Sequence, residues 1–231
     1  MSLTVSTDQQ HKWLHLAGLS STAGCAWVAE YTRLGAVELT HTIDSAVVLL
    51  RGRHLHKARE LLRESEARIK SMPPLNDSIS RVLWRWHWSA LAYERYCSED
   101  LDTAHELLRQ ADEEVLLALE QPFLLTLANH CYDFQLQRAR IERNRRRWEE
   151  VARHVELGRA MLENRQPLCI LRSGLKVYIT DVDDFHRSID ATDDNDRVAL
   201  QQILDQGRRR EIFEALVRDI YVIPGFVIPY P

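Results

Sequence analysis

Apolar residues recur at every third or fourth position between Leu101 and Pro122, and the same pattern appears once before and once after that stretch. This spacing places side chains on one face of a helix, so each copy predicts an amphipathic helix. The apolar-face positions are Leu101, Ala104, Leu107, Leu108, Ala111 and Val115 in the middle copy, Leu55, Ala58, Leu61, Leu62, Ser65 and Ile69 before it, and Trp148, Val151, His154, Val155, Gly158 and Leu162 after it. Such regular recurrence indicates a helical repeat protein.

Turn residues and prolines divide the first 167 residues into further helices. Pro73-Pro74, Pro122 and Pro167 each mark a helix boundary, because the residue before a proline avoids the helical conformation. The resulting order of helix, short turn, helix and proline predicts antiparallel hairpins that bury their apolar faces against one another. The predicted helices cover approximately residues 7–19, 22–34, 36–50, 54–72, 76–98, 101–122, 123–145 and 148–164.

The pattern changes after Pro167. Residues 175–179 could form a short strand or a helical turn, residues 181–196 contain seven aspartates and predict a solvated loop, and a further helical pair is expected at 197–206 and 209–221. The tail Ile220–Pro231 is apolar and contains three prolines, so it predicts no regular structure. This tail either covers the last hairpin as an irregular cap or inserts into a partner or a second copy, and we prefer the cap.

Composition supports an all-α fold. Glycine and proline number only 8 and 7 among 231 residues, fewer than sheet-rich folds need for their turns.

The net charge of −4 creates no general field that would attract nucleic acid or an anionic membrane. The sequence contains no run of 18 apolar residues, so it predicts no membrane-spanning helix. The cysteines are widely separated and predict buried thiols in a reducing compartment, so we expect a cytoplasmic location; they are Cys25, Cys97, Cys131 and Cys169.

The paired helices resemble tetratricopeptide (TPR) repeats. That family places small residues seven positions apart in the second helix, with a bulky residue between them, as in Ala104, Leu108 and Ala111; Ala58, Leu62 and Ser65; and Val151, Val155 and Gly158. It also has a small residue twelve positions earlier, where this chain has Ala46, Ala92 and Ala139. The period here is 46 and then 47 residues, longer than the family's period of about 34. The resemblance covers 36–167, with N-terminal helices at 1–35 and the acidic loop, helical cap and tail at 168–231.

The resemblance implies an α-solenoid whose first helices line a concave face that binds peptides. Arginine suits carboxylates and aromatic rings suit extended peptides, so we expect a non-enzymatic scaffold or adaptor that binds a partner protein or acidic peptide. Trp84 and Trp88 should lie in the core, whereas Trp86 should face the partner. The candidate partner-binding residues are Arg51, Trp86, Tyr93, Tyr96, Asp133, Arg140, Arg143 and Asn144.

Two other functions remain open. The densest basic run, Arg138–Arg147, could bind nucleic acid, although it is also consistent with a solvated helix end or with pairing to the acidic loop. A ligand-sensing regulatory domain is the second alternative, although no DNA-reading helix-turn-helix is evident. We predict no catalytic residues, no metal and no cofactor, because the chain lacks a Gly-rich phosphate loop and the HExxH and GxSxG motifs. His54 and His56 point to different helix faces, and the acidic loop lacks calcium-binding spacing.

Overall fold

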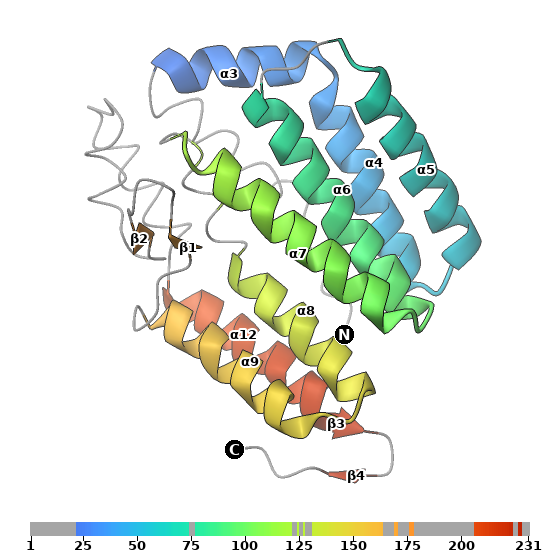
Figure 1. The fold of residues 1–231 in the computed structure, drawn as a ribbon, viewed down its shortest axis with the longest axis vertical. Helices are drawn as coiled ribbons and strands as arrows, with labels where there is room; N and C mark the ends of the chain where they lie inside the picture. Colours follow the sequence, from blue (N-terminus) through green and yellow to red (C-terminus); the bar gives the residue numbers. More distant parts are fainter. Residues whose placement is uncertain are drawn as a thin grey trace.

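The computed structural model describes residues 22–73, 77–121, 124, 127, 131–163, 169–170, 176–177, 206–223 and 226–227. These residues form an all-α fold (Figure 1). The helices are α3 (Thr22–Arg33), α4 (Ala36–Arg51), α5 (Leu55–Ser71), α6 (Asp77–Cys97), α7 (Leu101–Ala118), α8 (Cys131–Asn144), α9 (Trp148–Leu162) and α12 (Gln206–Tyr221). The predicted helix at 7–19 and the acidic loop at 181–196 lie outside the described residues.

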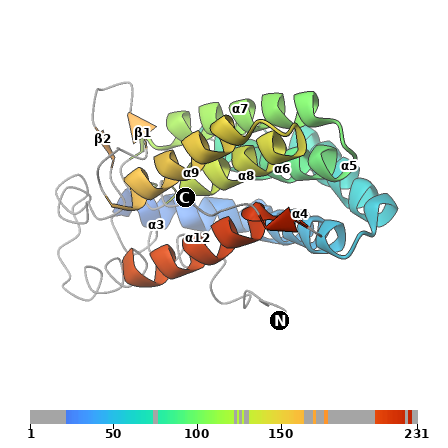
Figure 2. The same cartoon turned by 90° about the horizontal axis from the view of Figure 1, so that it is seen from below.

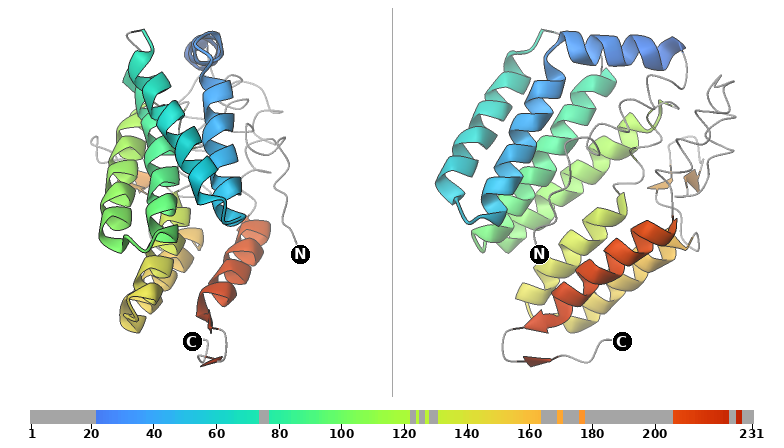
Figure 3. Two further views of the ribbon diagram at one scale, coloured as in Figure 1. Left: turned by 90° about the vertical axis from the view of Figure 1, so that its right-hand side faces the viewer. Right: turned by 180° about the vertical axis from the view of Figure 1, so that it is seen from behind.

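Consecutive helices pack as three antiparallel hairpins, α4 with α5, α6 with α7 and α8 with α9. Helix α6 also packs against both helices of the first hairpin, whereas α8 contacts the second hairpin mainly through α7. Helix α12 packs against α8 and α9, and Figures 2 and 3 show it on the same side of the molecule as α4.

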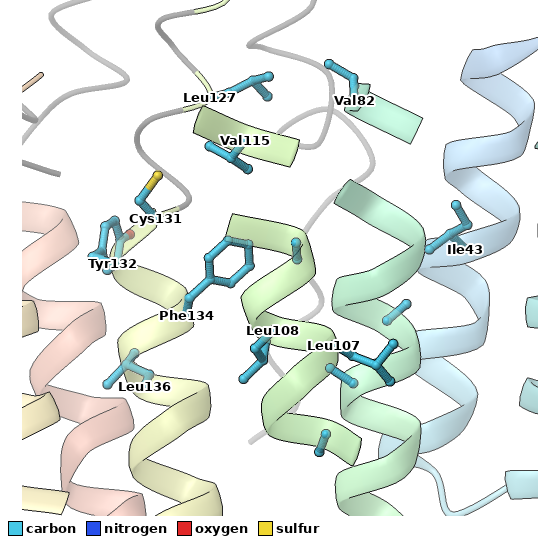
Figure 4. Close-up of a cluster of buried hydrophobic side chains, with 14 of the residues drawn as sticks. Ile43, Val82, Leu107, Leu108, Val115, Leu127, Cys131, Tyr132, Phe134 and Leu136 are labelled. Atoms are coloured by element: carbon cyan, nitrogen blue, oxygen red, sulfur yellow. The ribbon is translucent and has the colours of Figure 1, made fainter. Parts of the chain in front are cut away.

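Small residues allow these helices to approach closely. Ala46, Ala92 and Ala139 of the first helices are at most 2% exposed, and Ala104 and Ala111 of α7 are fully buried. Figure 4 shows the core between the hairpins, where the ring of Phe134 projects from α8 toward α7 and Leu108. Burial of this apolar surface supplies the main stabilising free energy of the fold.

Gly158 illustrates why one of these positions is so small. A Cβ atom on Gly158 would lie 2.7 Å from the ring of Phe213, a residue of α12 that is itself fully buried. Phe213, Val217 and Ile220 form the apolar face of α12, so this helix is part of the same core as the third hairpin.

The turns that close the three hairpins share one geometry. Each contains a non-glycine residue in the left-handed conformation, with φ of 61° at Arg53, 63° at Glu99 and 60° at Arg146. In each, the next residue's N–H donates to the carbonyl five residues earlier, at 2.9 Å from His54 to Leu49, 3.0 Å from Asp100 to Arg95 and 3.0 Å from Arg147 to Glu142. This bond is the helix-ending pattern usually associated with glycine. The positive-φ residues recur after 46 and 47 positions, the period found in the sequence.

The structure corrects the predicted start of α8. We expected a helix from Phe123, but Leu124 and Leu127 lie in 3₁₀ turns and α8 begins at Cys131. Both leucines are at most 1% exposed. Three residues per turn place residues three apart on the same side, so a 3₁₀ connection can hold both leucines against the core.

The C-terminal region also differs from the prediction. The helix expected at 209–221 is present as α12, which begins three residues earlier, at Gln206, whereas 197–205 of the other expected helix lie outside the described residues. The expectation that 220–231 has no regular structure is wrong, because β3 (Val222–Ile223) pairs antiparallel with β4 (Phe226–Val227). The prolines lie outside the paired residues, so they remove no donor from this ladder. Of the two alternatives left open for 175–179, a short strand or a helical turn, the strand is observed, with β2 (Lys176–Val177) paired to β1 (Cys169–Ile170).

The left-handed turn residues generate a stability prediction. A side chain in this conformation costs conformational energy that glycine avoids, so we expect Glu99→Gly to raise the free energy of unfolding by about 0.5–1 kcal/mol. Glu64 is an exposed residue inside α5, and Glu64→Gly should lower that free energy by about 1 kcal/mol. Urea unfolding of both variants tests this, and a destabilised Glu99→Gly protein would contradict the geometry of the turn.

A buried histidine generates a second prediction. His87 is 1% exposed, its Nδ1 lies 3.1 Å from the Ser65 hydroxyl, and burial lowers its pKa from 6.5 to about 4. Between these two values the unfolded chain binds a proton that the folded protein excludes, so this stabilisation is full above pH 6.5 and is lost as the pH falls. We expect the free energy of unfolding to decrease by about 2 kcal/mol from pH 7 to pH 5 on account of His87 alone.

The pH dependence is measured by urea unfolding at both pH values. His87→Asn should reduce the decrease by about that amount, whereas the same change at His56, whose side chain is 88% exposed, should leave it unaltered. An equal decrease in wild type and His87→Asn would contradict the prediction.

Candidate functional site: a cleft between α6 and α8

The structure brings four of the predicted site residues together between α6 and α8. A cleft of about 200 Å³, open solvent included, is lined by Ala92, Tyr93, Tyr96, Leu108, Gln137, Arg140 and Ile141. Tyr93 and Tyr96 lie on one face of α6 because they are three residues apart, and their rings stack with centroids 6.0 Å apart. Arg140 and Arg143 occupy the equivalent face of α8. The apolar lining residues of the cleft are buried, whereas the two tyrosines, Gln137 and Arg140 are half-buried.

Arg140 is the cation of this cleft. Its guanidinium forms no hydrogen bond or ion pair with any described residue, and burial lowers its pKa although Tyr93, Tyr96 and Asp133 oppose that shift. Arg51, exposed at the end of α4, is close enough to affect the pKa of both Arg140 and Tyr93. A partly desolvated guanidinium with unused donors favours binding of an oxyanion.

Arg143 has a different role from the one predicted. Its Nη2 donates a hydrogen bond of 2.9 Å to the Tyr96 hydroxyl, and its Nη1 lies 3.4 Å from the carbonyl oxygens of Asp219 and Ile220. These carbonyls belong to the last turn of α12. No further turn of helix follows whose N–H groups could donate hydrogen bonds to them. Arg143 therefore joins the rim of the cleft to the C-terminal end of α12, where a cation is also favoured by the helix dipole.

The remaining predicted residues lie at the edges of this region. Trp86 is half-buried, and the Cζ atom of Arg85 lies 3.7 Å from its ring centroid. Asp133 is half-buried on α8, two helical turns before Arg140. Asn144 is exposed at the end of α8. Trp84 and Trp88 stack on each other at 4.8 Å, and both pack against the core as half-buried side chains.

Sequence reasoning missed Arg85 and Asp44. Arg85 is 3% exposed, and its Nε and Nη1 atoms have no hydrogen-bond partner within the described part of the chain. Burial lowers its pKa to about 10, while Asp133, Asp44 and Asp112 oppose this from α8, α4 and α7. The signal in the sequence was that Arg85 follows Ile79 and Val82 at helical spacing, so it occupies an apolar-face position.

Three of the six arginines in the basic run Arg138–Arg147 form ion pairs within the protein. Arg138 forms an ion pair with Asp112, and Arg145 pairs with both Asp102 and Glu142. Arg147 lies 3.6 Å from the same Glu142 carboxylate. Phosphate binding requires free cations, so these contacts weigh against the nucleic-acid alternative. The acidic loop that was the other expected partner of this run lies outside the described residues.

Other classes of site find no support in the described residues. Within them, no group of three or more histidine, cysteine or acidic side chains could hold a metal ion. Ser65 and His87 form a hydrogen bond but are both at most 1% exposed, so a substrate could not reach them. No described helix is both long and apolar enough to cross a bilayer.

No family model, curated protein or solved structure matches this chain.

The contact between Arg143 and α12 is testable. Arg143→Gln removes the donors that reach the last carbonyls of α12, so amide exchange at residues 219–223 should accelerate and the free energy of unfolding should fall by about 1 kcal/mol. Arg146→Gln is the matched control, because Arg146 is exposed and its side chain forms no hydrogen bond or ion pair among the described residues. Unchanged exchange at 219–223 in Arg143→Gln would refute a role for Arg143 at the end of α12.

Proposed function

We propose that this protein is a non-enzymatic interaction scaffold that binds a segment of a partner protein across α4, α6 and α8. In this proposal the three hairpins are TPR-like repeats of an α-solenoid. The shared turn geometry at Arg53, Glu99 and Arg146 and its recurrence after 46 and 47 residues support that arrangement. The observation that carries the binding function is the cleft, in which Arg140 is desolvated, lacks a described partner and lies beside two tyrosines.

The chemistry of the cleft favours an acidic side chain of the partner. Arg140 and Arg51 present guanidinium groups that bind a carboxylate through paired hydrogen bonds. Tyr93 and Tyr96 provide rings that can pack against an aliphatic stem, and Tyr is enriched among the residues that dominate binding energies. Arg143 is occupied by Tyr96 and α12, so its proposed role is to position the rim and not to contact the partner.

An exposed apolar residue extends this surface along α4. Val48 is 62% exposed and lies one helical turn from Arg51. Exposed apolar side chains next to unpaired charges are common at the rim of interaction surfaces. The nucleic-acid and ligand-sensing alternatives have no comparable supporting feature among the described residues.

A photo-crosslinking experiment identifies the partner and tests the surface together. Benzoylphenylalanine at Val48 should crosslink a partner in the native cell, whereas the same group at exposed Glu113 on α7 should not crosslink that protein. The identified partner is then purified and its Kd is measured by calorimetry. Loss of a charge-assisted contact should weaken binding by about 10-fold to 100-fold in Arg140→Gln.

Arg109→Gln is the control for this measurement, because Arg109 is an exposed arginine of α7 that pairs with Glu106. It should leave the Kd within about twofold of wild type, since surface ion pairs contribute little. Circular dichroism verifies that both variants are folded. Equal Kd values for wild type and Arg140→Gln would remove the cleft from the binding surface.

A further inference from the structure

Tyr96 belongs both to the cleft and to a chain of hydrogen bonds that leads away from it. Its ring stacks on that of Tyr93, with centroids 6.0 Å apart, and it lines the cleft together with Gln137 and Arg140. Its hydroxyl oxygen lies 2.9 Å from Nη2 of Arg143, a residue that does not itself line the cleft. The Tyr96 hydroxyl is therefore the point at which the cleft meets Arg143.

The hydroxyl proton of Tyr96 is still available in this arrangement. An arginine side chain has no acceptor atom, so Arg143 is the donor of their hydrogen bond and the Tyr96 oxygen is the acceptor. No described residue accepts the Tyr96 proton. A hydroxyl that accepts from a guanidinium is a stronger donor, because hydrogen bonds in a chain polarise one another. Tyr96 is thus suited to donate to an oxyanion in the cleft.

Gln137 gives the cleft a second neutral donor. It precedes Arg140 by three residues, so the two side chains share one face of α8. The Gln137 amide is half-buried and forms no hydrogen bond with any described residue. The cleft therefore combines guanidinium, hydroxyl and amide donors. A carboxylate has acceptor positions for all three, because each of its two oxygens has two lone pairs.

Arg143 is held in turn by the C-terminal end of α12. Its Nη1 lies 3.4 Å from the carbonyl oxygens of both Asp219 and Ile220. Each contact is long for a hydrogen bond and weak by itself, but the two together with the bond to Tyr96 fix the plane of a rigid guanidinium. Because β3 begins directly after α12, the same turn of helix also starts the C-terminal hairpin of β3 and β4.

The contacts favour one direction of coupling between the cleft and α12. A carboxylate that drew Arg143 into the cleft would break its 2.9 Å bond to Tyr96 and remove the donor from the α12 carbonyls. Arg140 has no hydrogen bond or ion pair with any described residue, so it supplies charge to the cleft without such a loss. Arg140 therefore binds the carboxylate while Arg143 stays in place and orients Tyr96.

We propose that the C-terminal end of α12 controls the affinity of the cleft through Arg143 and Tyr96. Tyr96 is a binding residue whose hydroxyl donates to the carboxylate held by Arg140, and Arg143 is a positioning residue that orients this hydroxyl. Binding in the cleft and ordering of the last turn of α12 then strengthen each other by the same factor, as linkage requires. Loosening of the β3–β4 hairpin weakens binding. This inference rests on the proposed function and names the regulation of its site.

A single acidic side chain serves as the probe. N-acetylglutamate N-methylamide is compared with N-acetylglutamine N-methylamide, which has the same shape without the charge, and NMR titration of the full chain gives each Kd. The glutamate compound should bind about fivefold tighter. Tyr96→Phe, which keeps the ring, and Arg143→Gln should each weaken its binding by about threefold to tenfold. Arg146→Gln is the control for Arg143→Gln and should leave the Kd within about twofold of wild type.

A double-variant cycle separates positioning by Arg143 from a general loss of structure. If Arg143 acts through the Tyr96 hydroxyl, Arg143→Gln weakens binding in the wild-type background and has no further effect in the Tyr96→Phe background. Circular dichroism verifies that all three variants are folded. An equal loss of affinity in both backgrounds would show that Arg143 acts by another route and would overturn the proposal.

Amide exchange measures the same coupling from α12. At saturation the glutamate compound should slow exchange at residues 219–223 by about threefold to tenfold in the wild-type protein and should have no effect there in Tyr96→Phe. Faster exchange on binding would mean that the carboxylate draws Arg143 away from α12. Either that result or unchanged exchange in the wild-type protein would overturn the coupling.

The remaining outcomes separate this inference from the proposed function. Glutamate binding that is lost in Arg140→Gln but is unaffected by Tyr96→Phe and Arg143→Gln leaves the cleft function standing and removes the coupling. If the glutamate compound does not bind, the coupling fails, whereas a crosslink from Val48 would still support an interaction scaffold. If neither binding nor a crosslink is found, both proposals fail.

Discussion

Close antiparallel packing within each hairpin is the constraint on which the rest of this structure depends. Two amphipathic helices can bury their apolar faces against each other only if the turn between them reverses the chain within a few residues. The left-handed residues at Arg53, Glu99 and Arg146 accomplish that reversal with the same backbone hydrogen bond each time. Alanines on the facing sides then let the helix backbones approach, and dispersion contacts accumulate over the whole length of each helix. The first helices are thereby held parallel to one another, and this places their polar faces side by side.

The third hairpin shows what happens where the packing changes. Helix α8 contacts the second hairpin mainly through α7, and the cleft opens where α6 and α8 face each other. Helix α12 completes the burial of the last hairpin, with Phe213 against Gly158 and a bidentate ion pair from Arg159 to Glu214 at 2.8 and 3.0 Å. Arg143 connects these two regions, because one guanidinium reaches both Tyr96 and the end of α12. The same side chain therefore contributes to stability and to the shape of the candidate site.

Charge is distributed unevenly between scaffold and surface. Carboxylates near the turns are satisfied internally, as at Glu94, which is 1% exposed and bonded by Arg59 at 2.6 Å. Arg51, Arg140 and Asp44 lack such partners among the described residues, and two of them are substantially desolvated. An uncompensated charge in a desolvated position lowers stability, so its retention is better explained by binding than by folding. This contrast is the physical basis for locating function at Arg51 and Arg140 and not at the ion-paired arginines of the basic run, Arg138, Arg145 and Arg147.

The sequence by itself determined the helices, their pairing and the period of the hairpins, because each of these depends on the spacing of residues within one or two helical turns. It also identified three of the seven residues that line the cleft, since Tyr93, Tyr96 and Arg140 follow from their positions on the first helices. Only the tertiary structure decided the role of Arg143, whose partners on α12 lie 76 and 77 residues further along the chain. The tertiary structure likewise decided the burial of Arg85, the 3₁₀ connection before α8 and the pairing of β3 with β4. These features depend on which surfaces meet across long sequence separations, and helical periodicity carries no information about such contacts.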